Sequence, residues 1–580
     1  MADLSRRGFL KGAGLIGGVA ATTGAAAVIG LTGCSPNSSS DKTQNSLATS
    51  TGTTTNIIWD EEYDVVIVGS GLAGATAAVA LAIEGNGEKC LLLEKGMNAL
   101  GNGNSPFSGG SVIYTDAQHQ ADCFTYWKDL RANFDTTPDD VLEVFVKYMA
   151  TTVDFFKKAG AQEQDYTLYE PGKVHLLQAS ATASDANGAA SDDSKYSSGS
   201  IISCWPEYPE FESSTSVGRM IFSGKVLSTV SKFMLSAIQA HEDIITHKTE
   251  APFTDLVQDI ETKAILGVQY NHEGKTFYAK ANKGVIMCLG GFERNHTMLQ
   301  DYLSMPVGYH LAGDGNTGDG FKPCADAGAD FWHMNSMAGT WNGAMKFDGS
   351  QHSPWFTLGR QYGITVGING RRYYMDVDYV VSQNWYYYLQ GKGDLRTDTA
   401  CRHGHQNIGG EWPHMVLPEK SWFIFDSAHL EQAVRGGVSP LTAGDPVAEG
   451  WAVKADTLEE LASLIDVPAD ELAITVDVWN DSCERGVDVQ YYRAPDWLTA
   501  VKEAPFYAIR CEPEFINTDG GPVRNAKAQI VGRDGNPIPN LYSSGEFGSV
   551  WCNMYQGGGN LSECVNFSRI AIDSILGKLA

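Results

Sequence analysis

An apolar run that breaks into a glycine-spaced turn constrains this chain more than any other feature. Residues 64–68 lead into a turn with Gly69, Gly71 and Gly74, and a second apolar run ends at Glu94. This order predicts a strand, a helix and a second strand, the unit that binds dinucleotides. The first glycine suits a tight turn, the second lets the backbone approach a pyrophosphate, and the third lets helix and strand pack closely. A plain glycine-rich turn would not explain Glu94, which is placed to accept hydrogen bonds from ribose hydroxyls.

The composition is that of a globular protein. The chain has 580 residues, of which 19% are charged, and its formal net charge is −27. This length allows two or more domains with sizeable cores. The negative charge argues against nucleic acid and anionic lipid as direct partners, because both are polyanions.

The first 34 residues have the character of an export signal. Arg6 and Arg7 precede an apolar stretch that has no acidic residue and ends at Cys34. We predict a twin-arginine lipoprotein signal in residues 1–34 and a flexible linker in residues 35–57, rich in Ser, Thr and Asn. Export and lipidation of Cys34 would anchor the protein to the outer face of a bacterial cytoplasmic membrane. An ordinary cleavage site with an incidental cysteine is the alternative.

The 11 cysteines follow no metal-binding spacing. The sequence contains no C-x-x-C pair, hence no haem attachment site of the C-x-x-C-H type and no zinc motif. We therefore predict no metal site. Scattered cysteines leave disulfides and an iron–sulfur cluster open.

The two ends of the chain share a sequence pattern that the middle lacks. Residues 58–296 and 505–580 combine apolar runs with glycine loops, whereas residues 297–504 are expected to be rich in helices and aromatic side chains. This predicts an α/β cofactor domain that is interrupted by an inserted substrate domain.

Several glycine-rich motifs in order resemble the flavoprotein family of fumarate reductases, urocanate reductases and 3-oxosteroid dehydrogenases. The resemblance covers nearly all of residues 60–580. It implies a Rossmann-like FAD-binding domain in two parts, 58–296 and 505–580, with an inserted α+β substrate-capping domain over 297–504. Besides the opening turn and Glu94, the matching motifs are residues 104–110, 283–292, 316–320, 327–329, 370–373, 540–546 and 557–560.

The resemblance implies that the cofactor is FAD, whose flavin N5 exchanges hydride with a substrate carbon. Glu94 is expected at the adenosine ribose, and Asp319 and Glu546 at the ribityl and phosphate side. No histidine lies near Ser105, where relatives with covalent flavin carry one, so noncovalent FAD is expected. The implied cofactor-binding residues are Gly69, Gly71, Ala73, Gly74, Glu94, Asn104, Ser105, Gly109, Gly110, Gly291, Asp319, Gly545, Glu546, Asn560 and Leu561.

Departures from the family pattern argue against fumarate as the substrate. Asn517 and Gln556 stand where fumarate reductases carry a histidine and an arginine, and residues 335–340 lack a further expected histidine. A dicarboxylate needs charged donors of that kind. The element from Tyr555 to Gly559 instead resembles 3-oxosteroid dehydrogenases, in which a tyrosine hydroxyl and a glycine N–H polarise a carbonyl.

The sequence thus predicts an FAD-dependent oxidoreductase acting on CH–CH groups, which reduces or forms a C=C bond conjugated to a carbonyl. Tyr555, Gly559 and the acid/base candidate Tyr379 are the predicted catalytic residues, and a small unsaturated enone or steroid-like compound is the expected substrate. An unsaturated monocarboxylate, bound by Arg371, Arg372 or Arg524, is the alternative. A flavin-bearing electron carrier without a substrate is a third reading. Electrons are expected from a separate cytochrome or quinol-linked membrane partner.

Overall fold

The computed structural model describes a large part of the chain, and every structural statement below concerns that part. The predicted export signal, the linker up to residue 56 and Tyr379 lie outside the described residues. The described residues are 57–131, 136–173, 175–178, 202–206, 211–222, 229–303, 309–310, 313–353, 362–373, 418–435, 441–491, 493, 495, 498–552 and 555–579.

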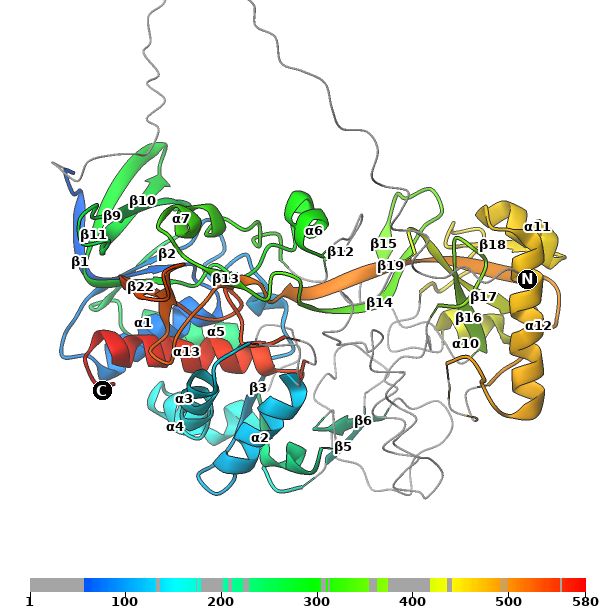
Figure 1. The fold of residues 1–580 in the computed structure, drawn as a ribbon, viewed down its shortest axis with the longest axis horizontal. Helices are drawn as coiled ribbons and strands as arrows, with labels where there is room; N and C mark the ends of the chain where they lie inside the picture. The colour runs from blue at the N-terminus through cyan, green and yellow to red at the C-terminus, as the bar shows by residue number, and fades with distance from the viewer. Residues whose placement is uncertain are drawn as a thin grey trace, which may run out of the picture. The chain divides into compact units, whose positions relative to one another are not determined.

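The apolar runs form the centre of a sheet that has eight strands within the described residues. In chain order these strands are β1 (Glu61–Val68), β2 (Cys90–Leu93), β8 (Ile245–Lys248), β9 (Phe253–Gln258), β10 (Ile265–His272), β11 (Lys275–Met287), β21 (Gln529–Val531) and β22 (Pro537–Ser543). Strands β22, β11, β1, β2 and β8 are parallel neighbours, whereas β21, β10 and β9 are added antiparallel (Figure 1). The predicted α/β class with a parallel sheet is confirmed.

Strand β1 is buried on both faces. Val65 and Ile67 pack into one hydrophobic core, and Val66 and Val68 pack into a second one on the other face. Successive side chains of a strand point to opposite faces, so an unbroken apolar run is what a strand covered on both sides requires. Because β22 pairs with β11, the C-terminal part of the chain joins the sheet that the N-terminal part begins. The domain boundaries at residues 296 and 504 stay a prediction.

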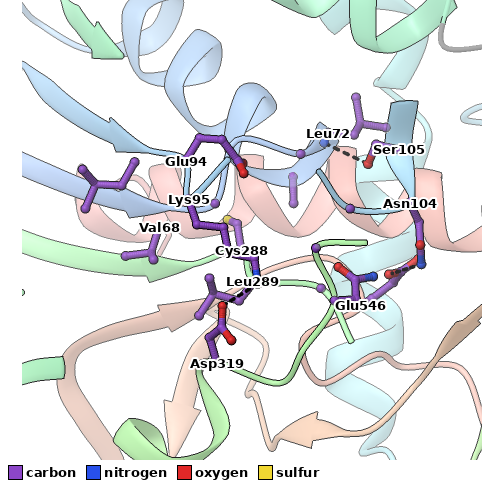
Figure 2. Close-up of a pocket in the computed structure, with 18 of the residues that line it drawn as sticks. Val68, Leu72, Glu94, Lys95, Asn104, Ser105, Cys288, Leu289, Asp319 and Glu546 are labelled. Carbon is purple, nitrogen blue, oxygen red and sulfur yellow. Dashed lines mark hydrogen bonds and ion pairs between the residues drawn. The ribbon is translucent and has the colours of Figure 1, made fainter. Parts of the chain in front are cut away.

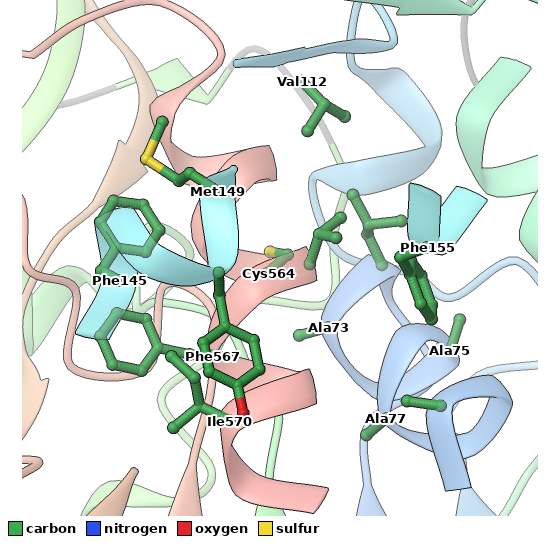
Figure 3. Packing of buried hydrophobic residues seen from close by; sticks show 14 of the residues in the cluster. Ala73, Ala75, Ala77, Val112, Phe145, Met149, Phe155, Cys564, Phe567 and Ile570 are labelled. Atoms are coloured by element: carbon green, nitrogen blue, oxygen red, sulfur yellow. The ribbon is translucent and has the colours of Figure 1, made fainter. Parts of the chain in front are cut away.

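One face of this sheet is covered by helices that come from distant parts of the chain (Figure 1). Ser568 Oγ donates to the backbone carbonyl of Ala73 over 2.7 Å, which joins the last helix to the first. Phe145 stacks on Phe567 in the same core (Figure 3), with ring centroids 5.4 Å apart. The helices are α1 (Leu72–Glu84), α2 (Gln120–Arg131), α3 (Asp139–Met149), α4 (Thr152–Lys158), α5 (Thr229–Gln239) and α13 (Gly559–Ile575).

Smaller elements complete this part of the molecule. Strand β7 (Gly218–Phe222) pairs with β3 (Ser111–Tyr114) and β4 (Tyr166–Tyr169), and β5 (His175–Gln178) pairs with β6 (Ile202–Trp205). The described 3-10 helices are η2 (Ser105–Phe107), η3 (Glu163–Asp165), η6 (Glu212–Ser216) and η10 (Ser427–His429).

A second sheet, with seven strands in the described part of the chain, gathers around the long strand β19 (Phe506–Thr518). Its other strands are β12 (Tyr309–His310), β14 (Met337–Met345), β15 (His352–Ser353), β16 (Gly363–Gly367), β17 (Ser421–Asp426) and β18 (Ala452–Ala455). Around them in sequence lie α6 (His296–Leu303), α7 (Phe321–Asp326), α10 (Leu430–Arg435), α11 (Leu458–Ile465), α12 (Ala469–Arg485), β13 (Phe331–Trp332) and β20 (Gly521–Pro522). Residues 297–504 were expected to be rich in helices, and their described part combines five helices with short strands, most of which join the sheet around β19, far away in the sequence.

A buried ion pair fixes the loop after β16. Arg372 donates from both terminal nitrogens to Asp488, over 3.0 and 2.9 Å, and both side chains are fully buried. The guanidinium lies over the rings of Trp479 and Tyr491. Such a bidentate, stacked geometry is one that arginine provides and lysine does not.

We expect Asp488→Ala to destabilise the fold by about 3–5 kcal/mol, because it leaves a buried guanidinium without its counter-ion. Denaturant unfolding followed by circular dichroism measures this loss. The matched control is Glu471→Ala, which removes the partner of the neighbouring but exposed Arg371 and should change the midpoint little. Equal effects of the two substitutions would contradict the assignment.

Candidate functional site

A cavity lies at the carboxyl ends of β1, β2 and β11, where open parallel sheets bind ligands (Figure 2). The predicted cofactor residues that line it are Gly69, Gly71, Ala73, Glu94, Asn104, Ser105, Asp319 and Glu546. Further lining residues that the sequence had not indicated include Lys95, Cys288, Leu289, Gly290, Asn316 and Ser544.

The turn from β1 into α1 leaves no room for a side chain at Gly69 or at Gly74. Gly69 has φ of +96°, and a Cβ atom there would lie 2.3 Å from the Cys288 carbonyl oxygen. A Cβ atom on Gly74 would lie 1.8 Å from the Gly69 carbonyl oxygen. The bare backbone thus brings the N-terminus of α1 to the cavity, where its N–H groups and its dipole favour phosphate. Ser105 Oγ accepts from one of these groups, the N–H of Leu72, over 3.0 Å.

Glu94 is buried at the end of β2 and faces the same cavity. Its Oε2 accepts from the N–H and the hydroxyl of Ser70, over 3.2 and 3.0 Å, and its Oε1 accepts from Gly96 N–H over 3.0 Å. The next residue, Lys95, donates from Nζ to Asp319 and to the Thr317 hydroxyl, over 2.7 Å each. These contacts fix the carboxylate that we expect to meet the adenosine ribose.

The two acids that the sequence grouped together lie at different places in the cavity (Figure 2). Asp319 is paired with Lys95, the residue that follows Glu94, whereas Glu546 accepts from Asn104 Nδ2 over 3.1 Å. The two acids therefore have different partners at the cavity.

The other predicted cofactor residues support the site from behind or lie beside it. A Cβ atom on Gly110, at φ of +67°, would lie 2.6 Å from Thr229 Oγ1, and one on Gly291 would lie 2.2 Å from Thr518 Oγ1. At these two glycines, threonine side chains can thus pack directly against the backbone. The predicted cofactor residues that do not line the cavity are Gly74, Gly109, Gly110, Gly291, Gly545, Asn560 and Leu561.

The loop before α13 brings the predicted catalytic residues Tyr555 and Gly559 together. Tyr555 is buried, and its hydroxyl oxygen accepts from Asn560 N–H over 3.3 Å. The Gly559 N–H, which we expected to polarise a substrate carbonyl, donates instead to the Gln556 carbonyl oxygen over 2.9 Å. Trp551 covers this glycine so closely that a Cβ atom would lie 2.1 Å from the indole ring. The first turn of the helix is the reason that this N–H already has an acceptor.

Asn560 has the properties of a ligand-binding side chain. It is buried, and neither its Oδ1 nor its Nδ2 has a hydrogen-bond partner among the described residues. Buried polar groups in native proteins are almost always paired, so this amide indicates a bound group that supplies both a donor and an acceptor. The pyrimidine end of a flavin has both.

The buried carboxyl groups of Glu293, Asp519 and Glu563 and the partly exposed one of Glu546 lie near the cavity and the loop before α13. Burial raises the pKa of Glu293 to about 7, and it raises the pKa values of Glu546 and Asp519 well above their usual range. The pKa of Glu563 is also raised by burial, although Arg524 opposes the shift. The sequence had indicated Glu546 alone. An acid two residues after a glycine pair, as in Gly290-Gly291-Phe292-Glu293, is the signal that could have found Glu293.

The residues that replace the fumarate-binding pattern have their own partners. Asn517 donates to Asp519 over 2.8 Å, and Gln556 accepts from the Tyr126 hydroxyl over 2.6 Å. His310 Nε2 contacts Asn104 Oδ1 at 3.1 Å, and His333 Nδ1 contacts the Ser549 carbonyl at 2.7 Å. These polar side chains therefore contribute to the packing around the site.

Within the described residues, no group of three or more His, Cys, Asp or Glu side chains could hold a metal ion, and no helix is long and apolar enough to cross a membrane. Eight described cysteines form no disulfide, namely Cys90, Cys123, Cys288, Cys324, Cys483, Cys511, Cys552 and Cys564.

Comparison with known proteins identifies the class of the fold. Residues 64–561 match the family model described as FAD binding domain. The chain therefore belongs to this family, and its cofactor is FAD. The expected family resemblance and the expected FAD-dependent oxidoreductase class are confirmed. Bound FAD supplies hydride transfer at flavin N5. Glu94, Asn104, Ser105, Glu546 and the N-terminus of α1 are the groups that would hold it.

The relatives named for their activity are oxidoreductases. The chain is 27% identical over 350 residues to a 3-oxosteroid 1-dehydrogenase of Mycobacterium tuberculosis, covering 55% of this chain and 58% of that relative. It is 25% identical over 581 residues to a digoxin reductase of Eggerthella lenta, covering 93% and 91%. The fold is similar to the crystal structure of a 3-ketosteroid delta1-dehydrogenase from Sterolibacterium denitrificans, with a TM-score of 0.62, 19% identity and coverage of 89% and 100%.

We expect Glu94→Ala to weaken FAD binding by about 10- to 100-fold, because hydrogen bonds to a charged group contribute about 1.5–3 kcal/mol. Titration of the apoprotein with FAD, followed by flavin fluorescence, measures the dissociation constant. Glu261→Ala, in the exposed loop between β9 and β10, is the control and should leave it unchanged. An unaltered dissociation constant in Glu94→Ala would remove this residue from the cofactor site.

Proposed function

We propose that this protein is a reductase that transfers hydride from FAD to a C=C bond conjugated to a carbonyl, in an apolar enone or steroid-like substrate. The steroid dehydrogenase and the digoxin reductase described above support this class of reaction. The reverse reaction, which forms the C=C bond, uses the same groups.

The ion pairs that three arginines form within the protein favour an uncharged substrate. Arg371 is held by Glu471 through two bonds of 2.7 and 2.6 Å, and Arg372 is held by Asp488. Arg524 is fully buried, pairs with Glu563 at 3.1 Å and donates to the Gly545 and Gly548 carbonyls. These are the three arginines that we named as possible counter-ions of an unsaturated monocarboxylate, and each already has an acidic partner.

The chemistry assigned to the residues follows from charge development. Hydride addition to the β-carbon places negative charge on the carbonyl oxygen, so a hydrogen-bond donor there lowers the barrier. Tyr555 Oη accepts from Asn560 N–H and still carries its own proton, which it can donate to that oxygen. A second group must protonate the α-carbon, and we propose Tyr379 for this role.

We expect Tyr555→Phe to slow reoxidation of the dithionite-reduced protein by its best enone about 10²- to 10³-fold, the usual effect of losing one such donor. Stopped-flow absorbance of the flavin under anaerobic conditions measures this rate, in a screen of unsaturated ketones and acids. Tyr148→Phe is the matched control, because that buried tyrosine bonds Asp573 instead.

Three outcomes would contradict the proposal. Intact enone turnover by Tyr555→Phe would remove this residue from catalysis. Reoxidation by unsaturated acids and not by ketones would favour the monocarboxylate alternative, and reoxidation by no compound would favour an electron carrier.

We further propose that the protein is exported by the twin-arginine route, carries lipid on Cys34 and receives electrons from a separate membrane cytochrome or quinol-linked protein. The signal pattern in residues 1–34 supports export and anchoring. The one predicted dinucleotide unit is taken by FAD, and this supports a separate donor.

We expect Cys34→Ser to move the protein from the membrane fraction to the soluble periplasmic or culture fraction, because the thioether-linked lipid is lost. Immunoblots of fractionated cells expressing the full chain measure this shift. Replacing Arg6 and Arg7 by lysine should retain the protein inside the cell. Membrane association that persists in Cys34→Ser would exclude the lipid anchor.

A further inference from the structure

The buried carboxyl group of Glu293 and the partly exposed one of Glu546 share one bridging side chain at the wall of the cofactor cavity. Asn104 Nδ2 lies 3.1 Å from Glu293 Oε1 and 3.1 Å from Glu546 Oε2. Glu293 Oε1 also accepts from Thr518 N–H over 2.9 Å. Asn104 and Glu546 line the cavity, whereas Glu293 lies behind them and is 2% exposed.

The surroundings oppose full ionisation of this pair. Two carboxylates that share one amide donor repel each other where water is largely excluded, and the uncharged amide cannot neutralise them. The titratable groups that interact with the pair are Asp519 after β19 and Glu563 and Cys564 on α13, and His310 on β12 contacts Asn104. Next to them, Cys288 after β11 and Arg524 before β21 interact with Cys564. The one cation among these described groups, Arg524, is paired with Glu563.

We infer that Glu293 and Glu546 together retain one proton at neutral pH, and that Glu293 is a positioning residue that couples FAD binding to this proton. The charge that the pair presents to the cavity is then −1 rather than −2. Entry of FAD brings an anionic pyrophosphate to the cavity and removes water from Glu546, and both effects favour the protonated pair. FAD binding therefore takes up a proton wherever the empty site has lost it. Burial raises the pKa of Glu293 to about 7, which agrees with loss of this proton from the empty site around neutral pH.

The inference concerns retention of the cofactor, and it does not depend on the substrate class proposed above. Failure to find an enone substrate would leave it untouched, and failure of the pH test below would leave the proposed reaction untouched. Both glutamates can be replaced by glutamine, which keeps the shape and the hydrogen-bonding capacity but carries no charge.

The test is the FAD dissociation constant of the apoprotein as a function of pH, from about 7 to 9, by flavin fluorescence. We expect the constant of the unaltered protein to rise by up to about tenfold per pH unit, the limit for one linked proton. Glu293→Gln should flatten this dependence to less than about twofold, and Glu546→Gln should flatten it as well. Glu261→Gln, a charge removed from an exposed loop, should keep the full slope.

A purely structural role of Glu293 predicts a different result. Glu293→Gln would then weaken FAD binding equally at every pH and keep the slope, and this outcome would overturn the inference. If His310 were the group that titrates, the FAD dissociation constant of Glu293→Gln would also keep its dependence on pH. If that variant does not fold, an indicator dye in weakly buffered solution at pH 8 reports proton uptake when FAD is added to the unaltered apoprotein. Absence of uptake would overturn the inference too.

Discussion

The close approach of three backbone segments at the turn after β1 is the constraint on which the rest of the structure depends. The carbonyl of Gly69 occupies the place of a side chain on Gly74, and the carbonyl of Cys288 occupies that of a side chain on Gly69. Strand β11 can therefore end directly beside the turn, and α1 can begin within reach of a pyrophosphate. The last helix reaches the same point, since Ser568 Oγ binds the carbonyl of Ala73 in the first turn of α1. The cofactor cavity thus joins segments nearly 500 residues apart.

The second constraint is electrostatic. A phosphate site gains from the positive end of α1, yet the walls of this cavity carry Glu94 and Glu546, with Glu293 directly behind. Glu94 is stabilised by three hydrogen bonds from Ser70 and Gly96, so its charge can be kept for ribose hydroxyls. For Glu293 and Glu546, desolvation is the largest influence and raises their pKa values. The same type of side chain therefore has two roles, which its surroundings decide.

Much of the cofactor site could be predicted from the sequence, because its signals are local. The glycine turn, Glu94 and Ser105 follow one another within 37 positions, and each has a fixed geometric role in a strand–helix–strand unit. The ion pair of Lys95 with Asp319 spans 224 residues, and the contact of Asn104 with Glu546 spans 442. Such partners have no shared local pattern. For the same reason the strands that pair with β19 could not be recognised from periodicity within their own short segments.

The electrostatics of the loop before α13 bear on the substrate as strongly as the engaged arginines do. Glu563 in the first turns of α13 and Asp519 after β19 are buried close to this loop, and Arg524 is the cation that Glu563 already neutralises. A substrate carboxylate placed here would add a further negative charge to a group of acids that cannot all ionise. In the reaction that we propose, a ketone oxygen adds none until hydride arrives, and the charge that it then develops would meet the hydroxyl of Tyr555 near the N-terminus of α13. The proposed site would thus disfavour an anionic substrate and still stabilise the charge that develops in the transition state.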